Sequence, residues 1–396
     1  MSNILLICHD IPSMTVGATL PIYHLIKHLG KKHDIHLICF DSKRYSADEI
    51  KNELKEITTL DIPEYKDLSG QFRYTFKNMI SIDNLHSRSL LNYYYRQDMS
   101  KLIQNSVTDD VDVIITDMPM AFYVKNVDRA KIVYAFDAVS DYNYRMYKKS
   151  SNITSQLYWY LNYWKIHRYE QVYNSFNYCI LVNEKDKQLL EKDIKIPLAV
   201  IPNGVDTDHF INNSVEEEVK LVFLGDMSTP PNNDAVKYFV DNIYPDVLKE
   251  MNIPFYIVGR NPSPYICNLN DDDNINVTGC VDDVREYLTR GCIFITPMIS
   301  GTGIKNKILE AMSMQLPVIS TSIGISGINA EDSVNYLLSD SSEDFKNNIL
   351  LLAKNSDLRE TIGNNARLFV ENNYSWKTSM ENVDKIIHEI TPEIFI

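Results

Sequence analysis

The stretch that decides the fold is residues 291–324, GCIFITPMISGTGIKNKILEAMSMQLPVISTSIG. It begins with an apolar run at 293–297 that is typical of a buried strand. A loop of small residues follows at 300–303, and apolar residues then recur at helical spacing over 304–312. The run at 318–321 indicates the next buried strand. Together these features predict a strand–loop–helix–strand unit of a doubly wound α/β domain.

The loop and the start of the predicted helix suit an anion. Gly301 and Gly303 let the backbone come close to a ligand, and a helix start presents free N–H groups with partial positive charge. Lys305 and Lys307 are predicted in the first helical turn, where two cations are unfavourable unless an anion lies opposite. Glu310 follows as a candidate acceptor for sugar or ribose hydroxyls. The alternative is a solvated helix start whose lysines point into water.

Three blocks of the C-terminal half carry a family resemblance. GTGIKNKILEAM followed by LPVIST, within 301–321, closely resembles the donor-site motif of the GT-B glycosyltransferases of family 4. Residues 200–206 resemble the family's IPNGVD, and residues 223–239 resemble a segment of one sugar-transferase branch. The resemblance implies an α/β chain with the GT-B fold: two Rossmann-like doubly wound domains facing across a cleft, with a C-terminal helix crossing back to the first domain.

The resemblance and the turn signals divide the chain into three parts. Residues 1–200 are expected to form an acceptor-binding Rossmann-like domain, and residues 201–375 a Rossmann-like domain that binds the nucleotide-sugar. Residues 376–396 are expected to form the crossover helix that packs on the first domain. Within the first domain, residues 41–108 are predicted to be mainly helical and polar.

Length, charge and apolar content limit the classes of function that the chain can have. The 396 residues leave room for two domains of ordinary size. The net charge is −14, with 25 Lys and Arg against 24 Asp and Glu in residues 1–200, and 14 against 29 in residues 201–396. An acidic chain argues against nucleic acid as a partner. No apolar run approaches the roughly 20 residues of a membrane span, so the protein is expected in the cytoplasm, peripheral at most to the inner face of a membrane.

The six cysteines predict neither a metal site nor a redox site. They include no C-x-x-C and no zinc-type pairing with histidine, and four of them lie in or beside apolar runs. Reduced cysteines that pack as small apolar side chains are therefore expected.

In the first domain, polar residues follow two predicted strands. The runs at 111–116 and 131–136 end in Asp117 and Asp137. Polar groups at the carboxyl ends of parallel strands face the ligand crevice of an open sheet. This position favours a ligand contact for either carboxylate.

The resemblance adds specific roles on the acceptor side. Asp137 and Ser140 match the D-x-x-S of the same sugar-transferase branch, which implies an acceptor ligand or base at Asp137. Gly17 lies in the loop that the family places near donor phosphate and acceptor. Phe136 stands where many members carry a histidine. The alternatives are helix capping by Asp137 or Ser140 and a plain turn glycine at position 17.

On the donor side, the resemblance implies a set of contacts with the nucleotide-sugar. They are Gly225, Arg260, Val281, Gly301, Thr302, Gly303, Ile304 and Glu310. Lys305 and Lys307 are expected to stabilise the departing diphosphate, and with Glu310 and Asp137 they form the expected catalytic set. Thr302 stands where many members carry a glutamate that touches the donor sugar, so the donor sugar stays open.

Residues 142–178 alternate Tyr and Trp with five Lys or Arg residues against one acid, Glu170. Aromatic rings and basic groups are both favoured at a lipid headgroup surface, which makes contact with an anionic membrane one interpretation. The other is a long helix whose Leu157, Tyr160, Leu161 and Trp164 pack into the protein core.

The sequence therefore predicts a glycosyltransferase of hexosyltransferase type. It is expected to move a sugar from a UDP- or GDP-sugar to a glycan or lipid-linked acceptor in bacterial surface polysaccharide synthesis. The resemblance implies retention of configuration and independence from metal; no cofactor is expected, because the nucleotide-sugar is a substrate. The alternatives are a nucleotide-sugar epimerase of the same fold and a transferase-like binding protein without turnover.

Overall fold

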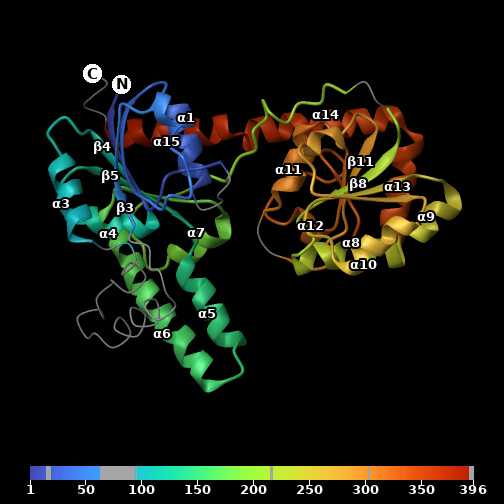
Figure 1. Cartoon of the computed structure of the whole chain (residues 1–396), viewed down its shortest axis with the longest axis horizontal. Helices are drawn as coiled ribbons and strands as arrows, with labels where there is room; N and C mark the ends of the chain where they lie inside the picture. The colour runs from blue at the N-terminus through green and yellow to red at the C-terminus, as the bar shows by residue number, and fades with distance from the viewer. Residues whose placement is uncertain (15–18, 63–93, 95, 215–216, 302–303, 392–396) are drawn as a thin grey trace. The chain divides into compact units, whose positions relative to one another are not determined.

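The structure is a computed structural model that describes residues 1–14, 19–62, 94, 96–214, 217–301 and 304–391. The chain forms two compact units (Figure 1). One comprises Met1–Asn203 together with Ser379–Ile396, and the other comprises Gly204–Thr378. Each unit is built on one parallel sheet, which confirms the prediction of two Rossmann-like domains.

The first unit contains a seven-stranded sheet in the order β3-β2-β1-β4-β5-β6-β7, and every pairing is parallel. Its strands are β1 (Asn3–Cys8), β2 (Asp34–Asp41), β3 (Glu56–Asp61), β4 (Val113–Asp117), β5 (Ala130–Phe136), β6 (Tyr178–Leu181) and β7 (Leu198–Val200). Its helices are α1 (Leu20–Leu29), α3 (Gln97–Ser106), α4 (Ala121–Val124), α5 (Val139–Lys149), α6 (Ile153–Glu170) and α7 (Glu184–Leu190). The order in the sheet reverses between β1 and β4.

The second unit contains a six-stranded parallel sheet in the order β10-β9-β8-β11-β12-β13. Its strands are β8 (Lys220–Leu224), β9 (Phe255–Val258), β10 (Ile275–Gly279), β11 (Cys292–Thr296), β12 (Val318–Ser320) and β13 (Leu337–Leu338). Its helices are α8 (Pro230–Asn242), α9 (Tyr244–Glu250), α10 (Pro264–Asn268), α11 (Asn306–Ser313), α12 (Ser322–Ile325), α13 (Ser342–Lys354) and α14 (Ser356–Asn373). Here the order reverses between β8 and β11.

Helices cover both faces of the second sheet because its strands are buried on both sides. Leu221 and Phe223 of β8 belong to an apolar cluster with residues of α8, α9 and α13. Val222 and Leu224 belong to a separate cluster with residues of α11 and α14. Successive side chains of a strand point to opposite faces, so a continuous apolar run supplies both clusters.

The C-terminal helix α15 (Trp376–Ile390) packs on the first unit, as predicted. Asp384 Oδ1 lies 2.8 Å from His33 Nε2, and its other oxygen lies 2.9 Å from Lys32 Nζ. The hydroxyl of Ser379 donates to the carbonyl of Pro202 at 3.0 Å. These bonds tie α15 to the turn after α1 and to the end of the first unit's main segment.

The prediction of a mainly helical stretch at 41–108 is wrong within the described residues. It contains β3, which pairs with β2 at the edge of the first sheet. The strand reads EITTLD and has no fully buried residue, so it lacks the apolar alternation that identifies a half-buried strand.

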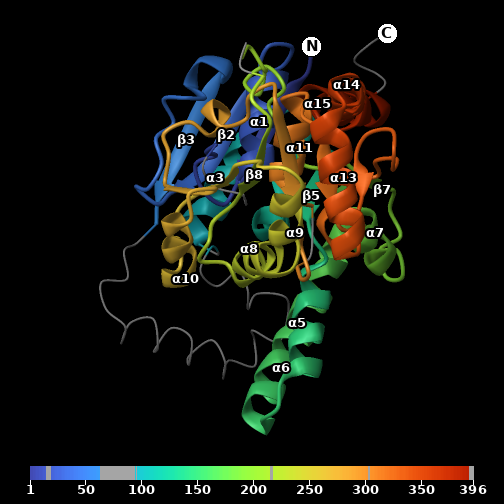
Figure 2. The ribbon, with the colours of Figure 1, turned by 90° about the vertical axis from the view of Figure 1, so that its right-hand side faces the viewer.

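Helices α5 and α6 form a hairpin that projects beyond the rest of the first unit (Figures 1 and 2). The two helices contact each other through aromatic rings, with the centroids of Tyr144 and Tyr163 5.2 Å apart and those of Tyr147 and Tyr160 5.4 Å apart. The alternative of a long helix packed into the core is wrong in its packing. The long helix is present as α6, but its Leu157 is 57% exposed, Tyr160 46% and Leu161 40%.

Candidate functional site

In the second unit, the reversal of strand order places the ends of β8 and β11 side by side. Open parallel sheets bind ligands outside the carboxyl ends of the strands at such a reversal. Gly225 follows β8, and Gly259 follows the neighbouring β9 with φ +146°. A Cβ on Gly259 would lie 1.8 Å from the carbonyl oxygen of Gly225, so only glycine allows this approach. The two strand ends therefore pack backbone against backbone.

Lys307 places an ammonium group at this reversal. Its Nζ donates to Asn232 Oδ1 at 2.8 Å and lies 3.9 Å from the centroid of the Phe223 ring, with Met298 Sδ also 3.9 Å away. Burial, with a smaller contribution from the charge of Lys305, lowers the pKa of Lys307 to about 7. Lys307 is thus not a solvated lysine.

Lys305 lies before the helix and not in its first turn, so that prediction is wrong. Its backbone is extended (φ −97°, ψ 98°), and its carbonyl accepts the first helical bond from Ile308 N at 2.9 Å. Its Nζ donates to the carbonyl of Ile323 at 3.1 Å, and its Cε lies 3.9 Å from where a Cβ on Gly301 would stand. Burial lowers the pKa of Lys305. The side chain therefore lies beside the glycine loop.

Glu310 brings a carboxyl group to the same helix, one turn after Lys307. It is half-buried, and burial raises its pKa to about 7 while the charge of Lys307 acts in the opposite direction. Within the part of the chain that the structure describes, its carboxylate has no hydrogen-bond partner. Near neutral pH this group can therefore either donate or accept a hydrogen bond.

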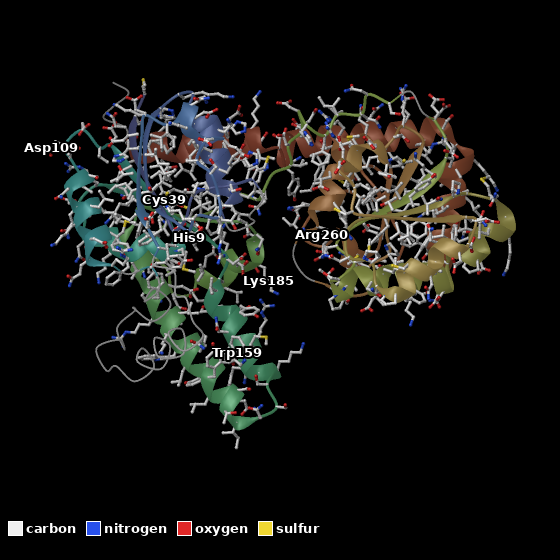
Figure 3. All side chains as sticks on the ribbon, viewed as in Figure 1. His9, Cys39, Asp109, Trp159, Lys185 and Arg260 are labelled. Carbon is white, nitrogen blue, oxygen red and sulfur yellow. The ribbon has the colours of Figure 1, made fainter. Side chains whose placement is uncertain are left out.

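The other residues that are predicted to contact the nucleotide-sugar lie in different surroundings. Arg260 Nε donates to Asp226 Oδ2 at 2.8 Å; hydrogen bonds from Ser228 and then from Arg260 lower the pKa of Asp226. Val281 and Ile304 are partly buried and pack against the apolar cluster beneath α11. Thr302 and Gly303 lie outside the described residues. Arg260 (Figure 3) remains 69% exposed beyond the end of β9.

On the first unit, Asp137 follows β5 after Phe136, whose φ is +65°. The residue is exposed, but partial desolvation of its carboxyl and the neighbouring Asp186 carboxyl raise the pKa of Asp137. Such a pair of acids holds a proton more readily than either acid alone. Gly17 lies outside the described residues.

Ser140 lies inside the first unit. It is 7% exposed, and its backbone N–H donates to Glu170 Oε1 at 3.0 Å. Glu170 ends α6 and is buried, which raises the pKa of its carboxyl to about 7 against the effect of the bonds from Ser140. Ser140 therefore helps to join α5 to α6.

Sequence reasoning missed the pairing of His9 with Asp117. His9 follows β1 and Asp117 ends β4, so the two residues meet at the reversal point of the first sheet. His9 Nδ1 lies 2.5 Å from Asp117 Oδ2, and the backbone N–H of His9 donates to the same oxygen at 2.9 Å. The available signal was a polar residue at the end of each of two apolar strands. Figure 3 shows His9 at the end of the sheet.

Two groups of described residues combine side chains of metal-ligand type: Cys8, His9 and Asp117; His33, Asp384 and His388. In the first group, burial and the charge of Asp117 raise the pKa of the Cys8 thiol well above its ordinary value. The thiol therefore stays protonated and donates to Asp117 at 3.1 Å. In the second group, Asp384 already pairs with Lys32 and His33. The carboxylates of Asp117 and Asp384 therefore already form hydrogen bonds within the protein.

Comparison with known proteins assigns the chain to a family. The family model described as Glycosyltransferase Family 4 matches residues 17–209, and the one described as Glycosyl transferases group 1 matches residues 218–355. The chain is 22% identical over 402 residues to an uncharacterized 44.6 kDa protein in the cps region of Klebsiella pneumoniae, covering 97% of this chain and 100% of that protein. It is 24% identical over 387 residues to an uncharacterized glycosyltransferase of Methanocaldococcus jannaschii, covering 95% of each.

Solved structures share the fold. A glycosyltransferase from Rickettsia africae matches with a TM-score of 0.63 at 16% identity, covering 98% of both chains. Anabaena HepE in complex with UDP matches with a TM-score of 0.63 at 14% identity, covering 98% of this chain and all of that one. Among the described residues, none of the helices has the length and apolarity that a membrane crossing requires. The chain belongs to the family 4 (group 1) glycosyltransferases, enzymes with the GT-B fold.

Proposed function

We propose that this glycosyltransferase transfers a sugar from a UDP- or GDP-sugar to a lipid-linked acceptor during the synthesis of a cell-surface polysaccharide. In this proposal the second unit binds the donor and the first unit binds the acceptor at the inner face of a membrane. The relative in the cps region of Klebsiella pneumoniae supports the polysaccharide setting. Anabaena HepE, solved with UDP and with UDP-glucose, supports the class of donor.

The observation that carries the proposal is the position of Lys307. Its half-buried ammonium lies where the sheet of the second unit reverses, and burial lowers its pKa to about 7. A diphosphate at this point would favour the charged form of the lysine, because an opposite charge nearby raises its pKa. The fully charged ammonium would then stabilise the negative charge that develops on the departing diphosphate.

The neighbouring predicted residues fit the same ligand. Lys305, whose charge acts on Lys307, lies beside Gly301, and in this proposal the two would bind the outer phosphate of the donor. Glu310, one turn further along α11, has a carboxyl group with no hydrogen-bond partner among the described residues, and it would bind ribose hydroxyls. Because protein cations carry the diphosphate, we expect transfer to continue after chelation of divalent metals with EDTA.

A nucleotide-release assay distinguishes this function from its alternatives. Purified protein is incubated with UDP- and GDP-sugars, with and without lipid-linked acceptors extracted from polysaccharide-producing cells. Transfer releases nucleoside diphosphate only when acceptor is present. Release or conversion of the donor without acceptor would identify an epimerase, and binding without either would identify a protein that lacks turnover.

The α5–α6 hairpin supports a membrane as the source of the acceptor. Its tip exposes Ile153 (83%), Leu157 (57%) and Tyr158 (52%) beside the exposed cations Lys148 and Lys149. Within residues 139–170, five Lys or Arg residues accompany only two acids in a chain whose net charge is −14. One of these acids is the buried Glu170, and the other pairs with Arg145 at 2.8 Å.

Such a surface fits anionic lipid headgroups. Apolar and aromatic side chains enter the region beneath the headgroups, and each nearby Lys or Arg contributes about 1 kcal/mol of attraction to an anionic leaflet. Trp159 lies on this hairpin (Figure 3), as does Trp164, so tryptophan fluorescence should respond to contact with lipid.

Vesicle co-sedimentation tests the membrane contact. We expect binding to vesicles that contain phosphatidylglycerol, weaker binding at high salt, and little binding to pure phosphatidylcholine. Replacing both Ile153 and Leu157 by Asp should abolish it. The control is Leu368→Asp on α14, because the Leu368 side chain is 56% exposed, close to the 57% of Leu157. Unchanged binding of the hairpin variant would contradict the membrane contact; a loss of self-association instead would identify a second copy as the partner.

A further inference from the structure

Two adjoining cavities lie along helix α14 of the second unit. The first, of about 490 Å³, is lined by Glu217 and Gly291 among others, and the second, of about 390 Å³, shares Gln315 and Asn364 with it. Both volumes fall within the range of ligand sites. Glu217 and Gly291 precede β8 and β11, whereas Lys307 lies where these strands end, against Phe223 of β8. These two spaces, the α14 cavities, are therefore separate from the proposed donor site.

One face of α14 runs along both cavities. Its lining residues extend from Ser356 in the first cavity through Asn364 to Glu371 in the second. An α-helix rises by about 1.5 Å per residue, so the face is about 22 Å long. Helix α11, which lies beside α14 (Figures 1 and 2), ends just before Gln315. The α14 cavities therefore suit an extended chain better than a single small molecule.

The charges of the lining balance. Arg367 Nε lies 2.6 Å from Glu371 Oε1, and Arg290 lies 3.7 Å from Glu360. Charge balance also holds for the whole lining, which contains three arginines and three glutamates: Arg290, Arg359, Arg367, Glu217, Glu360 and Glu371. A lining without net charge does not concentrate anions or cations, so it favours neither a phosphate nor a nucleic acid. The fitting ligand is polar and uncharged.

The amides of Gln315 and Asn364 lie where the two cavities meet. Gln315 Nε2 donates to Asn364 Oδ1 at 3.1 Å. Among the described residues, no hydrogen bond to Gln315 Oε1 or from Asn364 Nδ2 is present, so the pair offers an acceptor and a donor side by side. Two neighbouring sugar hydroxyls would use both, since a hydroxyl can donate and accept. Ile211 and Leu368, 40% and 56% exposed, line the second cavity and offer an apolar surface to the C–H face of a sugar ring.

Gln315 holds a backbone position that favours glycine. It follows α11 with φ +57°, in the left-handed region. Leu316 N–H donates to the carbonyl of Ala311, and the N–H of Gln315 donates to that of Met312, both at 3.1 Å. This pattern ends many helices and usually has glycine in the place of Gln315. Termination of the helix therefore does not account for the glutamine, whereas a contact between its amide and a ligand would.

We propose that the α14 cavities bind a chain of uncharged sugars, the polysaccharide that the proposed transfer would lengthen; the identity of this chain rests on the proposed function. The balanced charges, the paired amides and the length of the helix face all fit such a chain. Binding here would hold the chain on the enzyme between rounds of transfer and raise its effective concentration.

Gln315→Gly separates ligand binding from structure. Glycine adopts a positive φ without strain, so thermal stability should not fall. The acceptor amide is lost, so affinity for the sugar chain should fall by at least about tenfold. Ser333→Gly is the matched control, because Ser333 is exposed, has φ +61° and lines neither cavity. Asn364→Ala removes the partner amide without changing the backbone of Gln315, and should weaken binding similarly.

The probe is an array of bacterial surface oligosaccharides, uncharged and anionic, incubated with the full-length wild type and the three variants. We expect the wild type and Ser333→Gly to bind uncharged oligosaccharides, and Gln315→Gly and Asn364→Ala to bind them at least about tenfold more weakly. No binding by the wild type, equal binding by all four proteins, or binding confined to anionic oligosaccharides would overturn the proposal.

Methyl NMR of the wild type locates the bound oligosaccharide. The signals of Ile211 and Leu368 should shift, while those of Ile153 and Leu157 on the α5–α6 hairpin should not; the reverse would contradict the assignment. The array requires no donor and no turnover, so its outcome is independent of the nucleotide-release assay. If the wild type transfers sugar and Gln315→Gly binds oligosaccharides equally well, only this inference falls. If the wild type transfers no sugar, the proposed function falls, and so does the polysaccharide product as the occupant.

Discussion

The ammonium of Lys307 and the side-chain amide oxygen of Asn232 are 2.8 Å apart, joining the first turn of α11 to the first turn of α8. These helices follow β11 and β8, the two strands at the reversal of the second sheet. Each helix start carries partial positive charge, and Lys307 adds a whole charge between them. A single small region therefore combines two helix starts with a half-buried cation, which suits a diphosphate.

Replacing Lys307 by Met tests the catalytic role of this cation. Met keeps the unbranched shape and most of the length of the side chain and removes the charge, so we expect the fold to persist and kcat to fall by about 100-fold or more, roughly 3 kcal/mol of lost transition-state stabilisation. Lys249→Met is the matched control, because Lys249 is 74% exposed and, among the residues that the structure describes, pairs with Asp246 along α9. Equal turnover of the two variants would remove Lys307 from the site.

Glu310 is predicted to bind the ribose of the donor. Glu310→Ala should weaken the binding of nucleoside diphosphate by about tenfold, in line with one lost hydrogen bond to a group that can be charged. Calorimetry with the 2′-deoxy and 3′-deoxy nucleotides makes the test specific. The wild type should prefer the ribose form and the variant should lose that preference; an intact preference in the variant would refute the assignment.

The pH dependence of nucleotide affinity follows from the lowered pKa of Lys307. In the free protein the lysine loses its proton near pH 7, whereas bound diphosphate would keep it charged, so binding takes up a proton above that pH. Affinity should therefore fall between pH 7 and 9 by up to about tenfold per unit. The phosphates are already fully ionised in this range, since their last pKa is about 6. Ionisation of Glu310 above pH 7 also weakens binding, because its carboxylate repels the diphosphate. The charge of Lys305 is one cause of the lowered pKa of Lys307.

In Lys307→Met most of this slope should disappear, leaving the contributions of Glu310 and of Lys305, whose pKa burial also lowers. Affinities measured at several pH values in one buffer mixture are sufficient. A variant with the slope of the wild type would show that another group takes up the proton.

Local sequence patterns predicted the strand–loop–helix–strand unit at 291–324 well. Its two strands are continuous apolar runs, and its helix has a clear helical period. The strand β3 escaped prediction because it lies at the sheet edge, where no alternation is enforced by burial. The turn at 150–152 that separates α5 from α6 contains Ser, Ser and Asn, and the aromatic residues on both sides masked it.

The site was predictable only where its residues are close in sequence. Lys305, Lys307 and Glu310 fall within six residues of one another, whereas His9 and Asp117 are 108 positions apart. Their meeting depends on β1 pairing with β4 rather than with β3, which the sequence does not specify. The desolvation that shifts the pKa of Lys307 likewise depends on packing against Phe223, far along the chain.

Arg367 provides a test of the fold within the second unit. Its guanidinium is 15% exposed and donates to the carbonyls of Thr207 at 2.9 Å, Phe210 at 2.6 Å and Ser313 at 2.5 Å. Arg367→Met removes this donor from all three carbonyls, of which that of Phe210 still accepts from the Ser313 hydroxyl at 2.9 Å, and should destabilise the unit by about 1–3 kcal/mol in urea unfolding.

The control for Arg367 is Arg290→Met. Arg290 is 59% exposed and forms one long pair of 3.7 Å with Glu360, so its loss should change stability by no more than about 0.5 kcal/mol. Similar stability of the two variants would contradict a structural role for the Arg367 contacts.

The measurement that tests the central claim most directly is the calorimetric affinity of the wild type, Lys307→Met and Lys249→Met for a nucleoside diphosphate and for the corresponding nucleoside. We predict that Lys307→Met loses at least about tenfold of its affinity for the diphosphate, equivalent to about 1.4 kcal/mol, while the nucleoside binds all three proteins equally. Equal diphosphate affinity in all three proteins would show that this ammonium does not hold the donor.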